Sequence, residues 1–248
     1  MLGYDTDIII SFCTQADNVL QAFTHTGIIS AGKKGSVYSK PRWVNSIKSA
    51  VQLTQVQKDV LVGTMLGDAS MERVKENHNP RVKFEQTFPG HASYLTTIYI
   101  ILRNLVGKYP TVHTRLPDRR TGNSYSVIRF STLAFPCFTH YYDLFYTAQG
   151  KIVPHNIAEL LTPRALAYWI MDDGGRGNYG ETILHTRSFT LNDVQLLQHA
   201  LMINFDLRTR LIEKTPGQWV IVIPVKQTRP LKDVVAHYMC RSMLYKLT

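Results

Sequence analysis

The sequence predicts an α+β protein made of two similar halves. Two apolar helical segments, "LVGTMLGDA" (61–69) and "LAYWIMDDG" (166–174), each end at an aspartate beside a glycine. The same succession of a strand, a helix, two strands and a closing apolar segment follows each of them. Because two copies are too few for a solenoid, a pair related by a pseudo-two-fold axis is the natural arrangement.

Local signals place the elements of both halves. Thr54 and Gln57 have the spacing of a capping box, and Thr162 with Pro163 supplies an N-cap and a first-turn proline. The first half then predicts a strand at 81–87 and strands at 111–116 and 124–132. Between them it predicts a helix whose apolar face runs from Tyr94 to Leu105 and which ends at Gly107. The second half predicts a strand at 182–189, a helix that begins at Thr190, and strands at 207–213 and 219–223.

Three segments divide the chain. Residues 1–50 are expected to form an N-terminal extension, because 30–43 is rich in Gly, Ser and Lys and indicates a basic arm. The alternative is a tail left over from gene organisation. Residues 51–150 form the first repeat, and 151–248 form the linker and second repeat.

Charge and composition limit the function. Lys plus Arg number 28 against 18 for Asp plus Glu, a net charge of +10, which favours nucleic acid or an anionic membrane surface as partner. The longest apolar stretch, 94–106, is too short to span a bilayer. The N-terminus resembles neither a signal nor a transit peptide, and three isolated cysteines predict neither a disulfide framework nor a cysteine zinc site. These features indicate a soluble, anion-binding protein in a reducing compartment.

The two aspartates that end the helices, Asp68 and Asp173, are candidate metal ligands. They lie 105 residues apart, and small residues (Gly63, Gly67, Ala167) would let two parallel helices approach closely and bring the acids together. Adjacent carboxylates at negative helix C-termini repel each other, and divalent cations remove that cost. Hard oxygen ligands suit Mg²⁺, and clustered metals are usual for phosphodiester hydrolysis. The alternative is that each aspartate merely ends its helix beside a capping glycine.

Two lysines repeat with the aspartates. Lys151 follows Asp68 by 83 residues and Lys246 follows Asp173 by 73, each after the closing segment of its half. A lysine beside a phosphate can stabilise developing charge or lower the pKa of an attacking water. The alternative is a pair of ordinary surface lysines.

Basic side chains also alternate along the predicted strands. A period of two places each pair on one face of a sheet, where Arg and Lys can contact phosphates and read guanines in a major groove. An ordinary solvated sheet face is the alternative. The pairs are Arg81 with Lys83, His113 with Arg115, and Arg208 with Arg210; Arg129 and Arg187 are single strand positions.

The two aspartate-ending segments resemble the two copies of the LAGLIDADG motif. Together with "LTPRALAYWIMDDGG", "TRSFT" and the terminal "MLYKL", they make the chain similar to single-chain, two-repeat LAGLIDADG homing endonucleases encoded in organellar introns, a group that includes a yeast mitochondrial enzyme. The resemblance covers residues 51–248. Tyr168 and Ala69 depart from the motif, which has glycine at both positions.

The resemblance implies an αββαββα repeat that occurs twice, with the motif helices at the interface and two antiparallel sheets forming a DNA-binding saddle. It implies that Asp68 and Asp173 share two or more Mg²⁺ ions, for which Mn²⁺ can substitute, and that Asp172 is a cap or supporting residue. Lys151 and Lys246 become the basic residues near the active site, and Gln86 and Ser188 polar groups that position water. The implied reaction cuts both strands of a long asymmetric double-stranded DNA site to give 3′ overhangs. The implied protein is a monomer encoded and working in a mitochondrion or chloroplast.

Two other functions use the same fold. An RNA maturase would bind the host intron RNA and promote splicing, and a transcription factor would bind DNA without cutting it. The presence of both aspartates and both lysines favours the nuclease. Other nuclease motifs fit poorly, since "ENHNP" (76–80) lacks the spacing of an HNH site and no PD-(D/E)xK run is present.

Overall fold

The structure is a computed structural model that describes residues 45–247. The predicted basic arm at 30–43 therefore lies outside the described residues. Within them the chain divides into two compact units, one formed by 45–53 and 69–139, the other by 54–68 and 140–247. The repeats at 51–150 and 151–248 are stretches of sequence rather than these units, and they stay a prediction.

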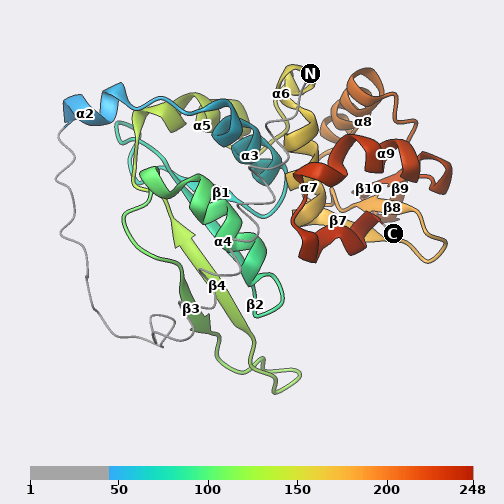
Figure 1. Ribbon diagram of the computed structural model, residues 1–248, viewed down its shortest axis with the longest axis horizontal. Coiled ribbons are helices and arrows are strands. Elements are labelled where there is room, and N and C mark those ends of the chain that lie inside the picture. Colours follow the sequence, from blue (N-terminus) through green and yellow to red (C-terminus); the bar gives the residue numbers. More distant parts are fainter. Residues whose placement is uncertain (1–44, 248) are drawn as a thin grey trace. The chain divides into compact units, whose positions relative to one another are not determined.

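The order of the elements follows the expected pattern twice (Figure 1). In the first half it is α3 (Gln55–Leu66), β1 (Ser70–Glu72), β2 (Arg81–Phe88), α4 (Ala92–Ile101), β3 (Thr111–Thr114), β4 (Ser126–Ser131) and α5 (Thr139–Phe145). In the second it is α7 (Pro163–Asp173), β7 (Gly174–Arg176), β8 (Thr182–Leu184), α8 (Leu191–Phe205), β9 (Arg210–Thr215), β10 (Gln218–Ile223) and α9 (Thr228–Val235). The αββαββα repeat and the α+β class are confirmed.

The first unit is an antiparallel sheet covered by a helix. Its strand order is β1-β2-β4-β3, and α4 lies against β2 and β4 (Figure 1). Alternation along β2 buries Val82 and Phe84, and Phe84 stacks on Phe130 of β4 with ring centroids 4.8 Å apart. The helix ends earlier than predicted, at Ile101, and a 3-10 turn at Arg103–Leu105 carries the last apolar side chain into the core.

The second unit contains a matching sheet, ordered β7-β8-β10-β9 and also antiparallel. Its helix α8 begins where predicted, because the Thr190 hydroxyl accepts a hydrogen bond from the Asp193 amide at 3.2 Å. The preceding strand was predicted too long. It ends at Leu184, and the chain then turns at 187–189 to reach that N-cap.

Helices α3 and α7 pack against each other within the second unit (Figure 1). Thr54 and Gln57 form the predicted capping box, and the Thr162 hydroxyl accepts from the Ala165 amide at 3.1 Å. A Cβ added at Gly63 would lie 2.2 Å from the Ala165 carbonyl oxygen and 2.8 Å from the Tyr168 Cβ. The helices therefore pack closely even though Tyr168 stands where the motif has glycine, because Gly63 faces the tyrosine.

The remaining helices are shorter. They are α2 (Asn45–Ala50) and α6 (Ile157–Leu160), and α6 packs on α8. Two-residue strands β5 (Tyr146–Thr147) and β6 (Gly150–Lys151) pair with each other and bring Lys151 to its place. Among residues 45–247 no helix combines the length and apolar character that a membrane crossing requires.

Candidate active site

The two motif aspartates lie at the same end of the α3–α7 pair. Asp173 is the last residue of α7, and Asp68 follows Gly67, which caps α3. Burial, together with the nearby Asp68 carboxylate, raises the pKa of Asp173 to about 7, while Lys151 and Lys246 act in the opposite direction. The structure thus brings together two acids that repel each other in the ionised form.

Asp172 joins the two helix ends. Its Oδ2 accepts a hydrogen bond from the Asp68 amide at 3.2 Å, and a Cβ at Gly67 would lie 2.4 Å from the Asp172 Cβ. A larger residue at position 67 would displace this carboxylate. Asp172 therefore holds Asp68 in place through the main chain that follows α3.

Both lysines donate to main-chain oxygens at the helix ends. Lys151 Nζ donates to the Gly67 carbonyl at 2.8 Å, and burial lowers the Lys151 pKa to about 8 against the attraction of the nearby aspartates. Lys246, only 5% exposed, donates from Nζ to the Asp172 carbonyl at 3.0 Å and to the Met171 carbonyl, and burial lowers its pKa. The four residues predicted to form the active site thus meet within one unit.

The donor set fits a divalent cation. Two carboxylates in a partly buried place lose their mutual repulsion when a cation lies between them, and oxygen ligands suit Mg²⁺. Among the described residues, no group of three or more His, Cys, Asp and Glu side chains could hold a metal ion by itself. An ion held by Asp68 and Asp173 would need further ligands, and Mg²⁺ typically takes them from water and phosphate oxygens.

The exposed face of the first sheet carries most of its predicted basic residues. Arg81, Lys83, Arg129 and His113 share it, and Arg115 follows β3 directly. Gln86 does not. It lies on the buried face, 7% exposed, with its Oε1 3.0 Å from His91 Nδ1.

The second sheet brings together fewer of the predicted residues. Arg210 begins β9, and Arg208 is exposed in the loop before it. The prediction that Arg187 is a strand residue is wrong, because Arg187 and Ser188 lie exposed in the turn between β8 and α8. Ser70 and Gly175 each lie two residues after a motif aspartate, and they pair with Lys83 and Ile183 respectively. Three residues further along each strand, Thr186 is therefore the counterpart of Gln86 in place of Ser188. Thr186 is buried and donates to the Trp219 carbonyl at 2.8 Å.

His185 is a residue that the sequence did not single out. Its amide donates to the Asp173 carbonyl at 3.0 Å, and its Nε2 lies 3.1 Å from a Cβ placed at Gly175. The His185 side chain is exposed at the surface, and partial desolvation, with the charges of Arg187, Lys246 and Lys214, lowers its pKa. The sequence offered no signal for His185, because it stood within the predicted strand 182–189 and a single histidine has no repeat partner in the first half.

Comparisons with known proteins identify the family of the chain. The model of the LAGLIDADG DNA endonuclease family matches residues 58–231. Cytochrome b mRNA maturase bI2 of Debaryomyces hansenii is 29% identical over 223 residues, covering 83% of this chain and 84% of the relative. DNA endonuclease I-ChuI of Chlamydomonas applanata is 30% identical over 213 residues, covering 80% and 97%.

A solved structure of a homing endonuclease is also similar to this chain. The homing endonuclease I-WcaI bound to its DNA recognition sequence matches with a TM-score of 0.74 and 26% identity, over 90% of this chain and 96% of that one. The family match covers more than half of the sequence and includes both motif aspartates, Asp68 and Asp173. The chain belongs to the LAGLIDADG DNA endonuclease family.

Proposed function

We propose that the protein is a site-specific homing endonuclease that makes metal-dependent double-strand cuts in a long asymmetric DNA site and so promotes mobility of its host intron. The observation that carries the proposal is the meeting of Asp68, Asp173, Lys151 and Lys246 at one end of the paired helices. The names of relatives support it, since I-ChuI is a DNA endonuclease and I-WcaI was solved on its DNA recognition sequence.

In this proposal Asp68 and Asp173 hold two or more Mg²⁺ ions, and Mn²⁺ can take their place. Divalent ions supply electrostatic stabilisation of the charge that develops on a phosphate during hydrolysis. Asp172 and the main chain of the two helix ends fix the carboxylates in place. Lys151, with a pKa lowered to about 8, exchanges a proton close to neutral pH and is suited to assist an attacking water.

The sheets supply DNA contacts in the same proposal. Exposed basic side chains bind phosphates in any sequence, and those that reach base edges select the site. Arrangement of the two sheets as a saddle belongs to the proposal too, as does a monomeric state. The proposed contacts are Arg81, Lys83, His113, Arg115, Arg129, Arg187, Ser188, Arg208 and Arg210; Gln86, with its buried side chain, is proposed to support the sheet near the DNA.

An organellar setting is proposed from the relatives. Several bear names that make them intron-encoded endonucleases, such as the probable intron-encoded endonuclease 1 of Wickerhamomyces canadensis. We therefore infer that this chain is encoded in an intron of a mitochondrion or chloroplast and acts there. The location of its gene tests this inference directly, since an open reading frame outside any organellar intron would contradict it.

The experiment that tests the function uses the full chain with Mg²⁺ and a duplex spanning the intron insertion locus without the intron. Cleavage of both strands, with 3′ overhangs, is the expected result. Binding without cleavage of either strand would overturn the nuclease proposal. Chelation with EDTA should stop cutting while leaving binding in place.

A maturase function is the second candidate, favoured by the similarity to the bI2 maturase. Splicing of the host intron RNA, assayed with and without the protein, tests it. The two activities separate if Asp68→Asn abolishes cutting and leaves splicing unchanged, because RNA binding has no need of the paired acids.

A further inference from the structure

Glu85 lies at the centre of the exposed face of the first sheet. It is on β2, directly opposite Arg129 on β4. Arg115 Nη2 donates to Glu85 Oε1, and Arg129 Nη1 lies 4.0 Å from Glu85 Oε2. One carboxylate therefore pairs with two of the arginines proposed to contact DNA.

The network continues across the third strand. Arg129 Nη2 lies 3.4 Å from His113 Nδ1, and His113 Nε2 lies 2.9 Å from the Thr111 hydroxyl. The ladder places Thr111 opposite Arg129, so the contacts run across β2, β4 and β3 on one face. The Arg129 side chain is thus held from two sides.

A similar arrangement recurs at the edge of the sheet. Glu72 on β1 pairs with Arg81 at 2.5 Å and with Lys83 at 3.0 Å, and hydrogen bonds from Lys83 and Arg81 lower its pKa. Four basic side chains of this face therefore lie beside a carboxylate. The face alternates in charge, and it differs from a uniformly positive surface made only for phosphates.

We propose that Glu85 is a specificity-determining residue that positions Arg115 and Arg129 for reading bases and opposes indiscriminate binding of phosphates. The inference rests on the proposed DNA-binding function. A guanidinium has five N–H donors in a rigid fork, so one edge can bind the carboxylate while the other stays directed away from the sheet. Such a fixed edge suits the paired acceptors O6 and N7 of guanine.

Loss of the carboxylate has a definite consequence. Both guanidinium groups would turn freely and bind any phosphate within reach, and the negative charge that repels the backbone would be gone. Affinity for unrelated DNA would rise while discrimination among sequences fell, since specificity is a difference of two affinities. A residue with a purely structural role would not raise affinity when altered.

The test compares Glu85→Gln with Glu76→Gln in the full chain. Both changes remove one negative charge, but Glu76 is exposed in the loop between β1 and β2. Binding of a random-sequence duplex is titrated at several salt concentrations without divalent metal. We expect Glu85→Gln to bind severalfold more tightly, with a slope of log K against log salt more negative by about one. Glu76→Gln should retain the wild-type slope.

Selection from a randomised duplex library gives the second readout. Wild-type protein should enrich a long motif, and Glu85→Gln should enrich the same motif with lower information at a few adjacent positions. The added affinity should disappear when Arg115→Gln and Arg129→Gln are combined with Glu85→Gln. An unchanged slope and an unchanged motif for Glu85→Gln would overturn the inference alone, whereas a wild-type protein that enriches no sequence would overturn the proposed function as well.

Discussion

Lys246 donates a hydrogen bond from Nζ to the main-chain oxygen of Asp172, 3.0 Å away, at the residue directly before a motif aspartate. Lys151 makes the equivalent contact with Gly67, the residue before Asp68, at 2.8 Å. Carbonyl groups at a helix C-terminus carry partial negative charge and lack partners within the helix. Each lysine therefore stabilises a helix end and places an ammonium group beside an acid.

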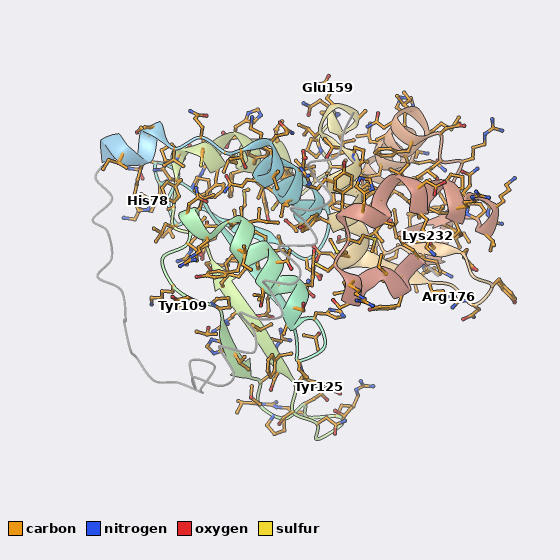
Figure 2. All side chains as sticks on the ribbon, in the orientation of Figure 1. His78, Tyr109, Tyr125, Glu159, Arg176 and Lys232 are labelled. Carbon is orange, nitrogen blue, oxygen red and sulfur yellow. The ribbon has the colours of Figure 1, made fainter. Side chains whose placement is uncertain are left out.

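The buried lysine should contribute to stability as well as to cutting. Lys246→Met would leave the Met171 and Asp172 carbonyls without this donor, and we expect a loss of about 1–3 kcal/mol in the free energy of unfolding. Urea unfolding measures it. Lys232→Met, at an exposed position on α9 (labelled in Figure 2), is the matched control and should change little. Equal stability of the two variants would contradict the helix-end role.

Metal-free stability should depend on pH through Asp173. Its pKa rises from 3.8 to about 7 on folding, so between these values the folded state keeps a proton that the unfolded chain has lost. The unfolded state then binds fewer protons, and the free energy of unfolding falls as pH rises from about 4 to about 7. Unfolding in EDTA across this range should show a steeper fall for wild type than for Asp173→Asn. Parallel curves would contradict the shifted pKa.

Gly63 should tolerate no side chain. The added Cβ of Gly63→Ala would press on the Ala165 carbonyl, a main-chain atom, so α3 and α7 must separate. We expect a loss of about 1–3 kcal/mol and slower cleavage, because the two aspartates at the helix ends move as well. Gly90→Ala is the control, since a Cβ there meets nothing within 4 Å. If both variants unfold and cut as wild type does, the close approach of the helices is not required.

A buried ion pair crosses the same two helices. Arg164 Nη1 lies 3.3 Å from Asp59 Oδ2, and the Arg164 guanidinium also lies 4.9 Å from the centre of the Tyr238 ring. Asp59 and Arg164 are 105 positions apart, which is also the separation of the motif aspartates. Equivalent positions of the two repeats therefore carry opposite charges.

Replacing one partner of this ion pair should lower the free energy of unfolding more than replacing both. Asp59→Leu would leave a buried guanidinium without its partner carboxylate and should cost about 3–5 kcal/mol, whereas Asp59→Leu combined with Arg164→Met should be close to neutral. Denaturant unfolding of both single variants and the double variant completes the cycle. Additive losses would show that the pair is not coupled.

Strong local signals in the sequence located most of the fold. The capping residues Thr54, Thr162 and Thr190 begin their helices as predicted, and the alternation from Arg81 to Phe88 forms a strand. The short strands β1 and β7 have three residues each, too few to show a period, so no local pattern located them. The strand β4 begins at Ser126, two residues later than predicted. The preceding Tyr125 is exposed in the β3–β4 loop (Figure 2), and it extends the strand pattern in the sequence without joining the strand.

The site was predictable where it repeats and unpredictable where it does not. Asp68 and Asp173 could be paired with Lys151 and Lys246 because both halves carry them. Single residues had no such support. The turn before Thr190 removed Arg187 and Ser188 from the strand. Gln86 lies on the buried face because the alternation along β2 places it with Val82 and Phe84. The carboxylates of Glu72 and Glu85 beside the basic residues depend on cross-strand neighbours that no local pattern contains.

The measurement that tests the central claim most directly is cleavage with Mg²⁺ by wild type, Asp68→Asn and Asp173→Asn on one duplex that wild type cuts, alongside binding of that duplex. The account predicts that each substitution abolishes double-strand cleavage while salt-sensitive binding stays within about twofold of wild type, because the proposed phosphate contacts lie on the sheets. Cleavage that persists in either variant, or binding lost together with cleavage, would contradict it.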